Sequence, residues 1–508
     1  MAAVSNVSPA ELGNGSIISS RGTRDDRRGV APPRRVLMTK AHASTTRSWF
    51  ATATAACTSS DRSHRPPRHP SIYARSQPHR PTTKNRTMTA PTLLNRKRVL
   101  MIPGPVEVST AVLEQMAGPP TSHVDPNFIN EFGEALEMLR TVFQCKDGQP
   151  FIVAGSGTLG WDMVAANLVE PGEAALVINT GLFGDRFGEA LEAYGASVTH
   201  VRAPAIGAVP TLDQVAAALR ERTYKVMTIT HVDTSTGVLI DLVALARVVR
   251  TVSPNTLVIV DGVCSVGGED LDMDAAGVDV TLTASQKALG APPGLSVVMA
   301  SQRAMATFKH RVTKPTSYYA SWAKWTPIMQ AYEARKPSYF ATPAVPLVKA
   351  LHASLKQIVA RPMANRTAYH AAISDLVKRT VTAWGLRLVP QGLDLAAHTM
   401  TAVYYPPGVS GAKLLASLAA KGVTIAGGLH PQIATQYFRI GHMGITATHD
   451  EELRYVHRTL ALLEAALREQ GYLQDADPTT DTVVGAARVP ASAPVPAPSM
   501  ELRMRPKL

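Results

Sequence analysis

Cysteine is scarce in this chain of 508 residues, which contains only Cys57, Cys145 and Cys264. These residues lack the spacing of metal or redox motifs, and they favour a reducing compartment over a disulfide framework. Long apolar runs are missing too, since none approaches the roughly 18 residues that a membrane-spanning helix needs. Internal repeats are also absent. We therefore expect a globular protein of two or more domains, with no metal site, no disulfide and no membrane partner.

Acidic residues are scarce near the N-terminus, and this accounts for most of the formal net charge of +13. Residues 1–90 hold 13 Arg and 2 Lys against four acidic residues, whereas the remaining 418 residues hold 37 basic and 35 acidic residues. The basic character thus belongs to a tail, and the body is almost neutral. RNA or membrane-surface binding would have to rest on this tail and would depend steeply on salt. Because the tail lacks regularly spaced aromatic residues, we expect no nucleic-acid partner.

Composition divides the chain into four regions. Residues 1–90 are rich in Ser, Thr, Arg, His and Pro and cannot bury enough apolar surface to offset their ordering entropy, so we predict a disordered basic extension. Its composition is typical of an organelle transit peptide, or it is untranslated sequence before a start at Met38 or Met88. The other regions are a large domain, a small C-terminal domain and a flexible tail, predicted at residues 91–342, 343–473 and 474–508.

Apolar runs alternate with helix-like stretches between residues 174 and 300, which favours a mainly parallel sheet sandwiched by helices. The expected strands are Ala174–Ile178, Ser197–Val201, Lys225–Thr230, Thr256–Val260, Asp279–Thr283 and Leu295–Ala300. After about Pro343 the order changes to long helices and then separated strands, at Ala344–Val359, Ala368–Ala383, Thr399–Tyr405 and Gln436–Gly441. We therefore predict an α/β fold for the large domain and an α+β fold for the smaller one.

A lysine and an aspartate at two successive strand ends are the strongest indication of function. Lys287 lies in the loop Ser285–Gly294 between two apolar strands, where a hydrated ammonium is costly to bury. Asp261 follows the strand Thr256–Val260, at the carboxyl edge where open α/β sheets bind ligands. Pyridoxal phosphate needs a lysine for a Schiff base and a carboxylate against its pyridinium nitrogen. Singly, these residues could be a surface lysine and a strand-end cap; together they favour a pyridoxal-phosphate site.

Four further segments offer side chains that would complete such a site. The amides and hydroxyls of Gly155–Thr158 could cradle a phosphate before a helix, or form an ordinary turn. Phe183 could stack on a planar ring, although core packing is the commoner role of Phe. The hydroxyls of His231–Gly237 could bond the ring's phenolic oxygen or cap a turn. Arg439, within an apolar strand, needs an anionic partner, either a substrate carboxylate or an internal Asp or Glu.

These residues resemble the class V, fold-type I pyridoxal-phosphate aminotransferases, and among them the alanine–glyoxylate (serine–pyruvate) group. The resemblance runs from about Met101–Pro105 to about Gln470, and Ser285–Gly294 is its most specific block. It implies a seven-stranded, mainly parallel sheet in the large domain and pyridoxal phosphate as cofactor. It also implies that small amino acids and 2-oxo acids are the substrates, with L-alanine and glyoxylate giving pyruvate and glycine. Serine–glyoxylate or serine–pyruvate transamination is the alternative.

The resemblance assigns roles to the positions that match the family's motifs. Lys287 would bind the cofactor covalently, Asp261 would pair with its pyridinium nitrogen, and Arg439 would take the substrate carboxylate. The other cofactor contacts it implies are Ser156, Gly157, Thr158 and Gln286 at the phosphate, Thr234 near the ring oxygen, and Phe183 against the ring. Tyr339 and Thr342 match positions that reach the phosphate of a neighbouring subunit, which implies an active homodimer.

Two positions depart from the family pattern. The ring-stacking residue is often Trp and is Phe183 here, and a phosphate-loop position that can be His is Thr158. Both are chemically workable, but they leave the amino donor open between alanine and serine. A cysteine desulfurase shares the fold and the Lys–Asp pair, yet it needs a nucleophilic cysteine well after the lysine. No cysteine follows Cys264, which argues against that activity.

The C-terminal residues resemble an import signal. The chain ends in Pro506-Lys507-Leu508, which is similar to the S-K-L peroxisomal signal, with proline in place of the preferred serine. We therefore expect a peroxisomal location and recognition by a peroxisomal import receptor. The N-terminal extension is a candidate for a second, mitochondrial address.

Overall fold

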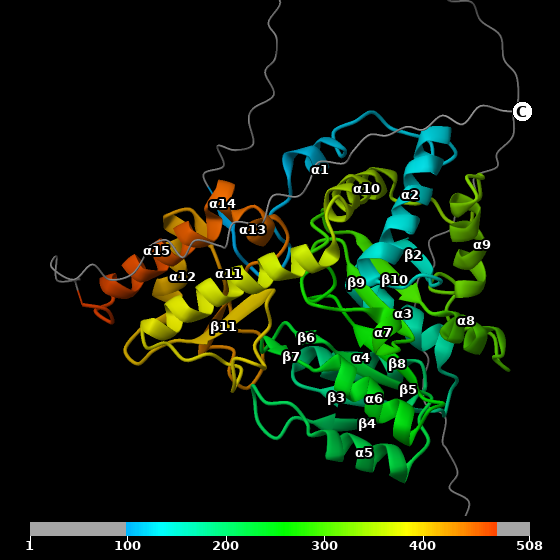
Figure 1. Cartoon of the computed structure of the whole chain (residues 1–508), viewed down its shortest axis with the longest axis horizontal. Helices are drawn as coiled ribbons and strands as arrows, with labels where there is room; N and C mark the ends of the chain where they lie inside the picture. The colour runs from blue at the N-terminus through cyan, green and yellow to red at the C-terminus, as the bar shows by residue number, and fades with distance from the viewer. Residues whose placement is uncertain (1–97, 475–508) are drawn as a thin grey trace, which may run out of the picture. The chain divides into compact units, whose positions relative to one another are not determined.

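The computed structural model describes residues 98–474, which contain a seven-stranded, mainly parallel sheet (Figure 1). In spatial order its strands are β2 (Gln149–Ala154), β10 (Leu295–Ala300), β9 (Val280–Ala284), β8 (Leu257–Asp261), β5 (Val226–Thr230), β3 (Ala174–Asn179) and β4 (Ser197–Arg202). The five strands from β9 to β4 run parallel, and β10 is antiparallel to both its neighbours. The predicted α/β fold is confirmed, and each of the six predicted strands lies within about one residue of its expected bounds.

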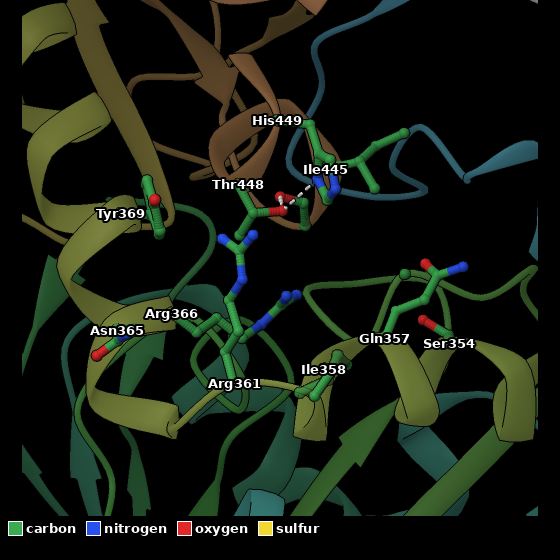
Figure 2. Close-up of a pocket in the computed structure, with 13 residues that line it drawn as sticks. Ser354, Gln357, Ile358, Arg361, Asn365, Arg366, Tyr369, Ile445, Thr448 and His449 are labelled. Atoms are coloured by element: carbon green, nitrogen blue, oxygen red, sulfur yellow. Dashed lines mark hydrogen bonds between the residues drawn. The ribbon is translucent and has the colours of Figure 1, made fainter. Parts of the chain in front are cut away.

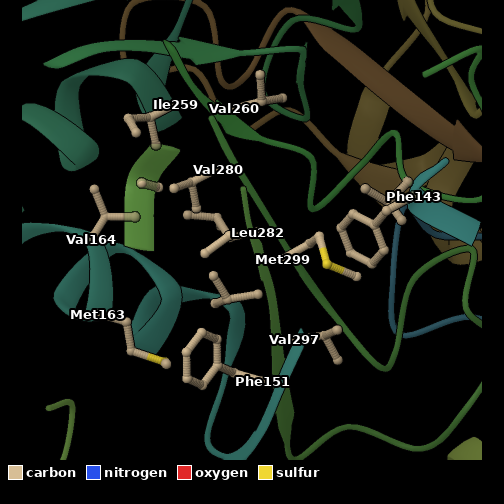
Figure 3. Close-up of a cluster of buried hydrophobic side chains, with 14 of the residues drawn as sticks. Phe143, Phe151, Met163, Val164, Ile259, Val260, Val280, Leu282, Val297 and Met299 are labelled. Carbon is tan, nitrogen blue, oxygen red and sulfur yellow. The ribbon is translucent and has the colours of Figure 1, made fainter. Parts of the chain in front are cut away.

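Continuous apolar runs form these strands because helices cover both faces of the sheet. Every residue of β3, β5, β8, β9 and β10 is buried. Figure 3 shows Phe151 of β2 near Met163, while Met299 of β10 lies beside Phe143. Burial of each such side chain stabilises the fold by about 1.5–3 kcal/mol.

The helices of this part of the chain connect the strands or pack over them. They are α1 (Thr110–Glu114), α2 (Pro126–Phe143), α3 (Gly157–Leu168), α4 (Leu182–Ala193), α5 (Leu212–Glu221), α6 (Leu242–Val252), α7 (Met273–Ala276), α8 (Gln302–Lys309), α9 (Trp322–Glu333) and α10 (Val345–Val359). Side-chain caps begin several of them: Asp125 accepts from two amides of α2, and Thr211 forms a capping box with Gln214 on α5. Two short strands, β6 (Val232–Asp233) and β7 (Val238–Leu239), form a separate antiparallel pair.

A smaller sheet follows α10. Strand β14 (Tyr437–Gly441) pairs antiparallel with β11 (Met400–Tyr404) and β13 (Ala426–Gly427). The helices of this part are α11 (Met363–Ala383), α12 (Gly411–Ala420), α13 (Ile445–Thr448), α14 (Asp450–Leu453) and α15 (Tyr455–Glu469). Its long helices and separated strands lie close to where the sequence predicts them.

The N-terminal strand packs with this smaller part rather than with the large sheet. Strand β1 (Val99–Leu100) pairs in parallel with β12 (Val423–Thr424). Val99 and Met101 are buried in the same apolar cluster as Phe438. The side chains of this strand thus fill the C-terminal core, and the predicted division at residues 91–342 and 343–473 stays a prediction.

The described residues contain no helix that is both long and apolar enough to cross a membrane. The predicted extension, residues 1–90, lies outside the described residues. The tail beyond residue 474, with its terminal Pro506-Lys507-Leu508, also lies outside them.

Candidate active site

Lys287 lies in the turn between β9 and β10, and its side chain is buried. Its Nζ donates a hydrogen bond to the carbonyl oxygen of Pro103, 184 residues earlier in the chain. Burial is the main cause that lowers the pKa of Lys287, and the nearby Arg439 guanidinium lowers it further. A lysine with a lowered pKa has a larger neutral fraction, and the neutral amine is the nucleophile. The position therefore suits covalent bonding to a carbonyl carbon.

Asp261 is the last residue of β8, and its carboxylate is buried at the carboxyl edge of the sheet. Oδ1 accepts a hydrogen bond of 2.9 Å from the Val263 amide, and Oδ2 accepts one of 2.8 Å from Trp161 Nε1. Burial raises the pKa of Asp261 to about 6, and these two hydrogen bonds oppose the rise. Asp261 forms no ion pair with any residue between 98 and 474. A buried carboxylate of this kind fits a cationic ring nitrogen.

The N-terminus of α3 provides an anion-binding surface. Ser156 is the N-cap residue, but its side chain makes no capping hydrogen bond, and Thr158 is exposed on the first turn. The first amides of the helix and these hydroxyls can therefore bind phosphate oxygens. Gly157 permits close packing behind them, since a Cβ there would lie 2.8 Å from a methyl of Val263. The buried Oε1 of Gln286, beside Lys287, has no hydrogen-bond partner among the described residues.

Asp233 links Phe183 to Thr234, because it accepts a hydrogen bond from the Phe183 amide and precedes Thr234 in the chain. Phe183 lies in the first turn of α4, where its amide donates a 3.1 Å hydrogen bond to Asp233 Oδ2. Its half-buried ring is 6.4 Å from the indole of Trp161, in a tilted arrangement. Thr234 follows β6 and is buried, and its carbonyl oxygen accepts a hydrogen bond from Arg439. Both residues thus contact groups that belong to the site.

Arg439 lies in the central strand of the smaller sheet and reaches across to the large part of the chain. Its Nε donates to the Gly427 carbonyl at 2.9 Å and its Nη1 to the Thr234 carbonyl at 3.0 Å. Burial lowers its pKa, and within residues 98–474 it has no ion pair. Its partners are therefore carbonyl oxygens rather than an internal Asp or Glu. A carboxylate ligand would provide the charge that these contacts lack.

Tyr339 and Thr342 are exposed at the surface of this chain. Tyr339 is 62% exposed, and its hydroxyl is 3.4 Å from that of Thr342, which is also exposed. Its ring lies 5.2 Å from that of His123. Within residues 98–474, neither hydroxyl forms a hydrogen bond with any of the other predicted site residues.

Three residues near the reactive pair were missed by sequence reasoning. Trp161, in the second turn of α3, donates a hydrogen bond to Asp261. It lies four residues after Gly157 and therefore on the same face of the helix, and this spacing could have indicated its role. Cys264 is buried near enough to raise the pKa of Lys287. Pro103 acts through its backbone carbonyl, which no side-chain pattern reveals.

The family model of the class-V aminotransferases matches residues 106–450. This chain belongs to the class-V aminotransferases. It is 41% identical over 384 residues to alanine–glyoxylate aminotransferase 1 of Saccharomyces cerevisiae, covering 73% of this chain and 98% of that protein. A serine–glyoxylate aminotransferase of Arabidopsis thaliana is 29% identical, with 73% and 91% covered. The crystal structure of an alanine–glyoxylate aminotransferase from Nostoc superposes with a TM-score of 0.67 at 30% identity, covering 73% and 95% of the two chains.

Class-V aminotransferases use pyridoxal phosphate, and the groups described above fit this cofactor. Lys287 suits the aldehyde, Asp261 the ring nitrogen, and the start of α3 the phosphate. The predicted enzyme class and cofactor are confirmed, and the substrates are amino acids and 2-oxo acids. Within residues 98–474, no group of three or more His, Cys, Asp or Glu side chains could hold a metal ion.

Proposed function

We propose that this class-V aminotransferase transfers the amino group of L-alanine to glyoxylate, producing pyruvate and glycine. The main supporting observation is the buried Arg439. Within residues 98–474 its guanidinium has only carbonyl partners, and it lies close enough to affect the pKa of Lys287. One carboxylate-binding arginine suits a small amino acid with one carboxylate. The similarity to alanine–glyoxylate aminotransferase 1 of S. cerevisiae supports alanine and glyoxylate as the substrate pair.

The residues of the chain divide the chemistry between them. When bound, pyridoxal phosphate supplies an aldehyde that condenses with amines and a ring that accepts electrons. Arg439 binds and orients the substrate carboxylate, and Nζ of Lys287 removes the proton from the substrate α-carbon and later returns one. Asp261 holds the proton on the ring nitrogen, while Trp161 and Val263 stabilise its ionised form. Ser156, Thr158 and the first amides of α3 hold the phosphate.

The decisive experiment follows the visible absorption of the purified chain, loaded with the cofactor, when L-alanine is added without a 2-oxo acid. We expect the absorption band to fall as one equivalent of pyruvate appears, and subsequent glyoxylate to restore the band with release of glycine. Lys287→Ala should release no pyruvate. A protein that reacts with L-serine but not with L-alanine would instead be a serine aminotransferase. A protein that stays colourless with added pyridoxal phosphate would contradict the site.

We further propose that the active unit is a homodimer, in which Tyr339 and Thr342 reach the phosphate site of the partner subunit. The exposure of this pair supports the proposal, because a single chain leaves both hydroxyls at its surface.

We also propose that the enzyme acts in the peroxisome and supplies glycine there, through recognition of Pro506-Lys507-Leu508 by an import receptor. A fluorescent protein fused to the N-terminus of the chain should accumulate in peroxisomes and should remain in the cytosol when the last three residues are removed. Fusion of residues 1–90 alone tests the mitochondrial address.

A further inference from the structure

A cavity of about 290 Å³ is lined in part by Gly290, which belongs to the loop that carries Lys287. Its walls come from the end of α10, the start of α11, the turn at the end of α13 and Gly290 of the Lys287 loop. Figure 2 shows the side chains of Arg361 and Arg366 in the space between these helices and the turn of Thr448 and His449. None of the predicted catalytic or cofactor-binding residues lines it. Its volume is close to the lower limit of small-molecule sites, about 300 Å³.

The two arginines make this cavity strongly cationic. Arg366 donates from Nε to the Gly267 carbonyl at 2.7 Å and from Nη2 to the Ala288 carbonyl at 2.6 Å, which leaves Nη1 without a hydrogen bond among the described residues. Burial lowers the pKa of Arg366 to about 10. Arg361 is exposed and has no hydrogen bond or ion pair within residues 98–474. Neither guanidinium is therefore neutralised by a carboxylate in the described part of the chain.

The opposite wall experiences this positive charge. Burial lowers the pKa of His449, the Glu452 carboxylate opposes this, and the charges of Arg366 and Arg361 lower the pKa further. Nδ1 of His449 lies 2.9 Å from the Thr448 hydroxyl, so Nε2 remains for another partner. The residues that line the cavity include no Asp or Glu. Such a concentration of uncompensated cations attracts an anion.

We propose that this cavity binds a phosphate group, either as inorganic phosphate or as part of a small phosphate ester. The donors are the guanidinium of Arg361 and Nη1 of Arg366, joined from the opposite wall by Nε2 of His449 when its ring is protonated, because the Thr448 hydroxyl donates to the Gly444 carbonyl. This arrangement suits the tetrahedral oxygens of phosphate better than a planar carboxylate, which a single arginine fork already matches. Arg366 also donates a hydrogen bond to the carbonyl of Ala288, the residue after Lys287. The same side chain would therefore contact both the bound anion and the Lys287 loop.

The test uses the full chain loaded with pyridoxal phosphate and freed of excess cofactor, so that the cofactor's own phosphate occupies the start of α3. Thermal unfolding is measured against sodium phosphate, with ionic strength held constant by sodium chloride. We expect a saturable rise in Tm. Arg361 is exposed and forms no hydrogen bond within residues 98–474, so its replacement should leave the fold intact. Arg361→Gln should weaken the apparent affinity for phosphate about tenfold, as expected for loss of one charged contact. Arg379→Gln is the matched control, an exposed arginine on α11 outside the cavity, and should behave as the unmodified enzyme.

Several outcomes would overturn the proposal. If phosphate produces no saturable rise, or if Arg361→Gln and the unmodified enzyme give the same affinity, then the cavity does not bind phosphate. Sodium malonate, which offers only carboxylates, should stabilise less than phosphate, and equal stabilisation would overturn the preference for phosphate. A phosphate ester such as glycerol phosphate, compared with inorganic phosphate, distinguishes the two sources of the group. The assay contains no amino acid or 2-oxo acid, so its result is independent of the proposed function.

Discussion

At the scale of single residues, Asp261 sets the pH range in which the site can work. Burial raises its pKa to about 6, above the ordinary value of about 3.9. The folded, cofactor-free protein therefore binds a proton more tightly than the unfolded chain, so the contribution of Asp261 to stability falls as pH rises from about 4 to about 6. The ionised form that pairs with a pyridinium nitrogen predominates only above this range. We expect cofactor affinity to decline as pH falls below about 6.

Trp161 is the residue whose removal tests this account. Trp161→Phe deletes a hydrogen bond to the Asp261 carboxylate, so the pKa of Asp261 should rise and the acid limb of cofactor binding should move to higher pH. Loss of a hydrogen bond to a charged group should also weaken affinity about tenfold at pH 7. Both effects are measured by titrating the cofactor-free protein with pyridoxal phosphate at a series of pH values between 5 and 8 and following the absorbance. Trp384→Phe, packed in the smaller core, is the control, and an identical profile for both variants would refute the role of Trp161.

At the scale of structural elements, the segment after β1 is part of the site although it precedes the large sheet. Pro103 accepts the hydrogen bond from Lys287, and the Val106 amide donates to the Gln286 carbonyl at 3.1 Å. Gly104 allows this close approach, because its φ is +93° and a Cβ would lie 2.5 Å from Lys287 Cδ. The segment therefore positions the loop that carries the reactive lysine.

Gly104→Ala should disturb that positioning. The left-handed conformation costs an L-residue about 1–2 kcal/mol, and the added methyl must displace the lysine side chain. We expect the visible band to form about tenfold more slowly after pyridoxal phosphate is added to the cofactor-free protein. Stopped-flow absorbance measures this rate. Gly118→Ala provides the control, since no atom lies within 4 Å of its added Cβ, and equal rates for the two variants would contradict this role.

At the scale of the whole described chain, the site lies where its two parts meet. One apolar cluster fills the large part and another fills the smaller part. A third cluster contains Val106, Cys264 and Ala288 together with Met400 and Met443, and so joins residues from both. Arg439 crosses the same junction to reach Thr234. If Arg439 binds the substrate carboxylate as proposed, substrate binding is coupled to the relative position of the two parts.

The proposed homodimer can be tested by mixing two inactive variants. If Tyr339 and Thr342 act on the partner's site, Lys287→Ala and the double variant Tyr339→Ala, Thr342→Ala should each be impaired alone. After co-refolding, hybrid dimers contain one site with unmodified lysine and unmodified partner hydroxyls, so transaminase activity should return. If the hydroxyls act within their own subunit, no hybrid contains a complete site, and the absence of recovery would exclude the proposal. Sedimentation of the variants confirms that dimers form.

Lys287 and Asp261 could be proposed from the sequence because the patterns that indicate them are local. Strand β8 is a continuous aliphatic run that ends in Asp261, and Lys287 follows the next such run, so the parallel arrangement places both at one edge. The hydrogen bond between Trp161 and Asp261 joins residues 100 positions apart, and no local pattern specifies it. The antiparallel direction of β10 and the pairing of β1 with β12 were missed for the same reason, since both depend on long-range contacts.

The sequence by itself determined the order of strands and helices and the class of enzyme, and it predicted Lys287 and Asp261 as the reactive pair. These properties depend on apolar periodicity and on a short motif, which involve only neighbouring residues. Only the tertiary structure decided the pKa of Asp261, the carbonyl partners of Arg439 and the cavity at Arg361 and Arg366. Burial and the distance to other charges control these properties. Both depend on which distant segments pack against a side chain, and packing is settled only when the whole chain has folded.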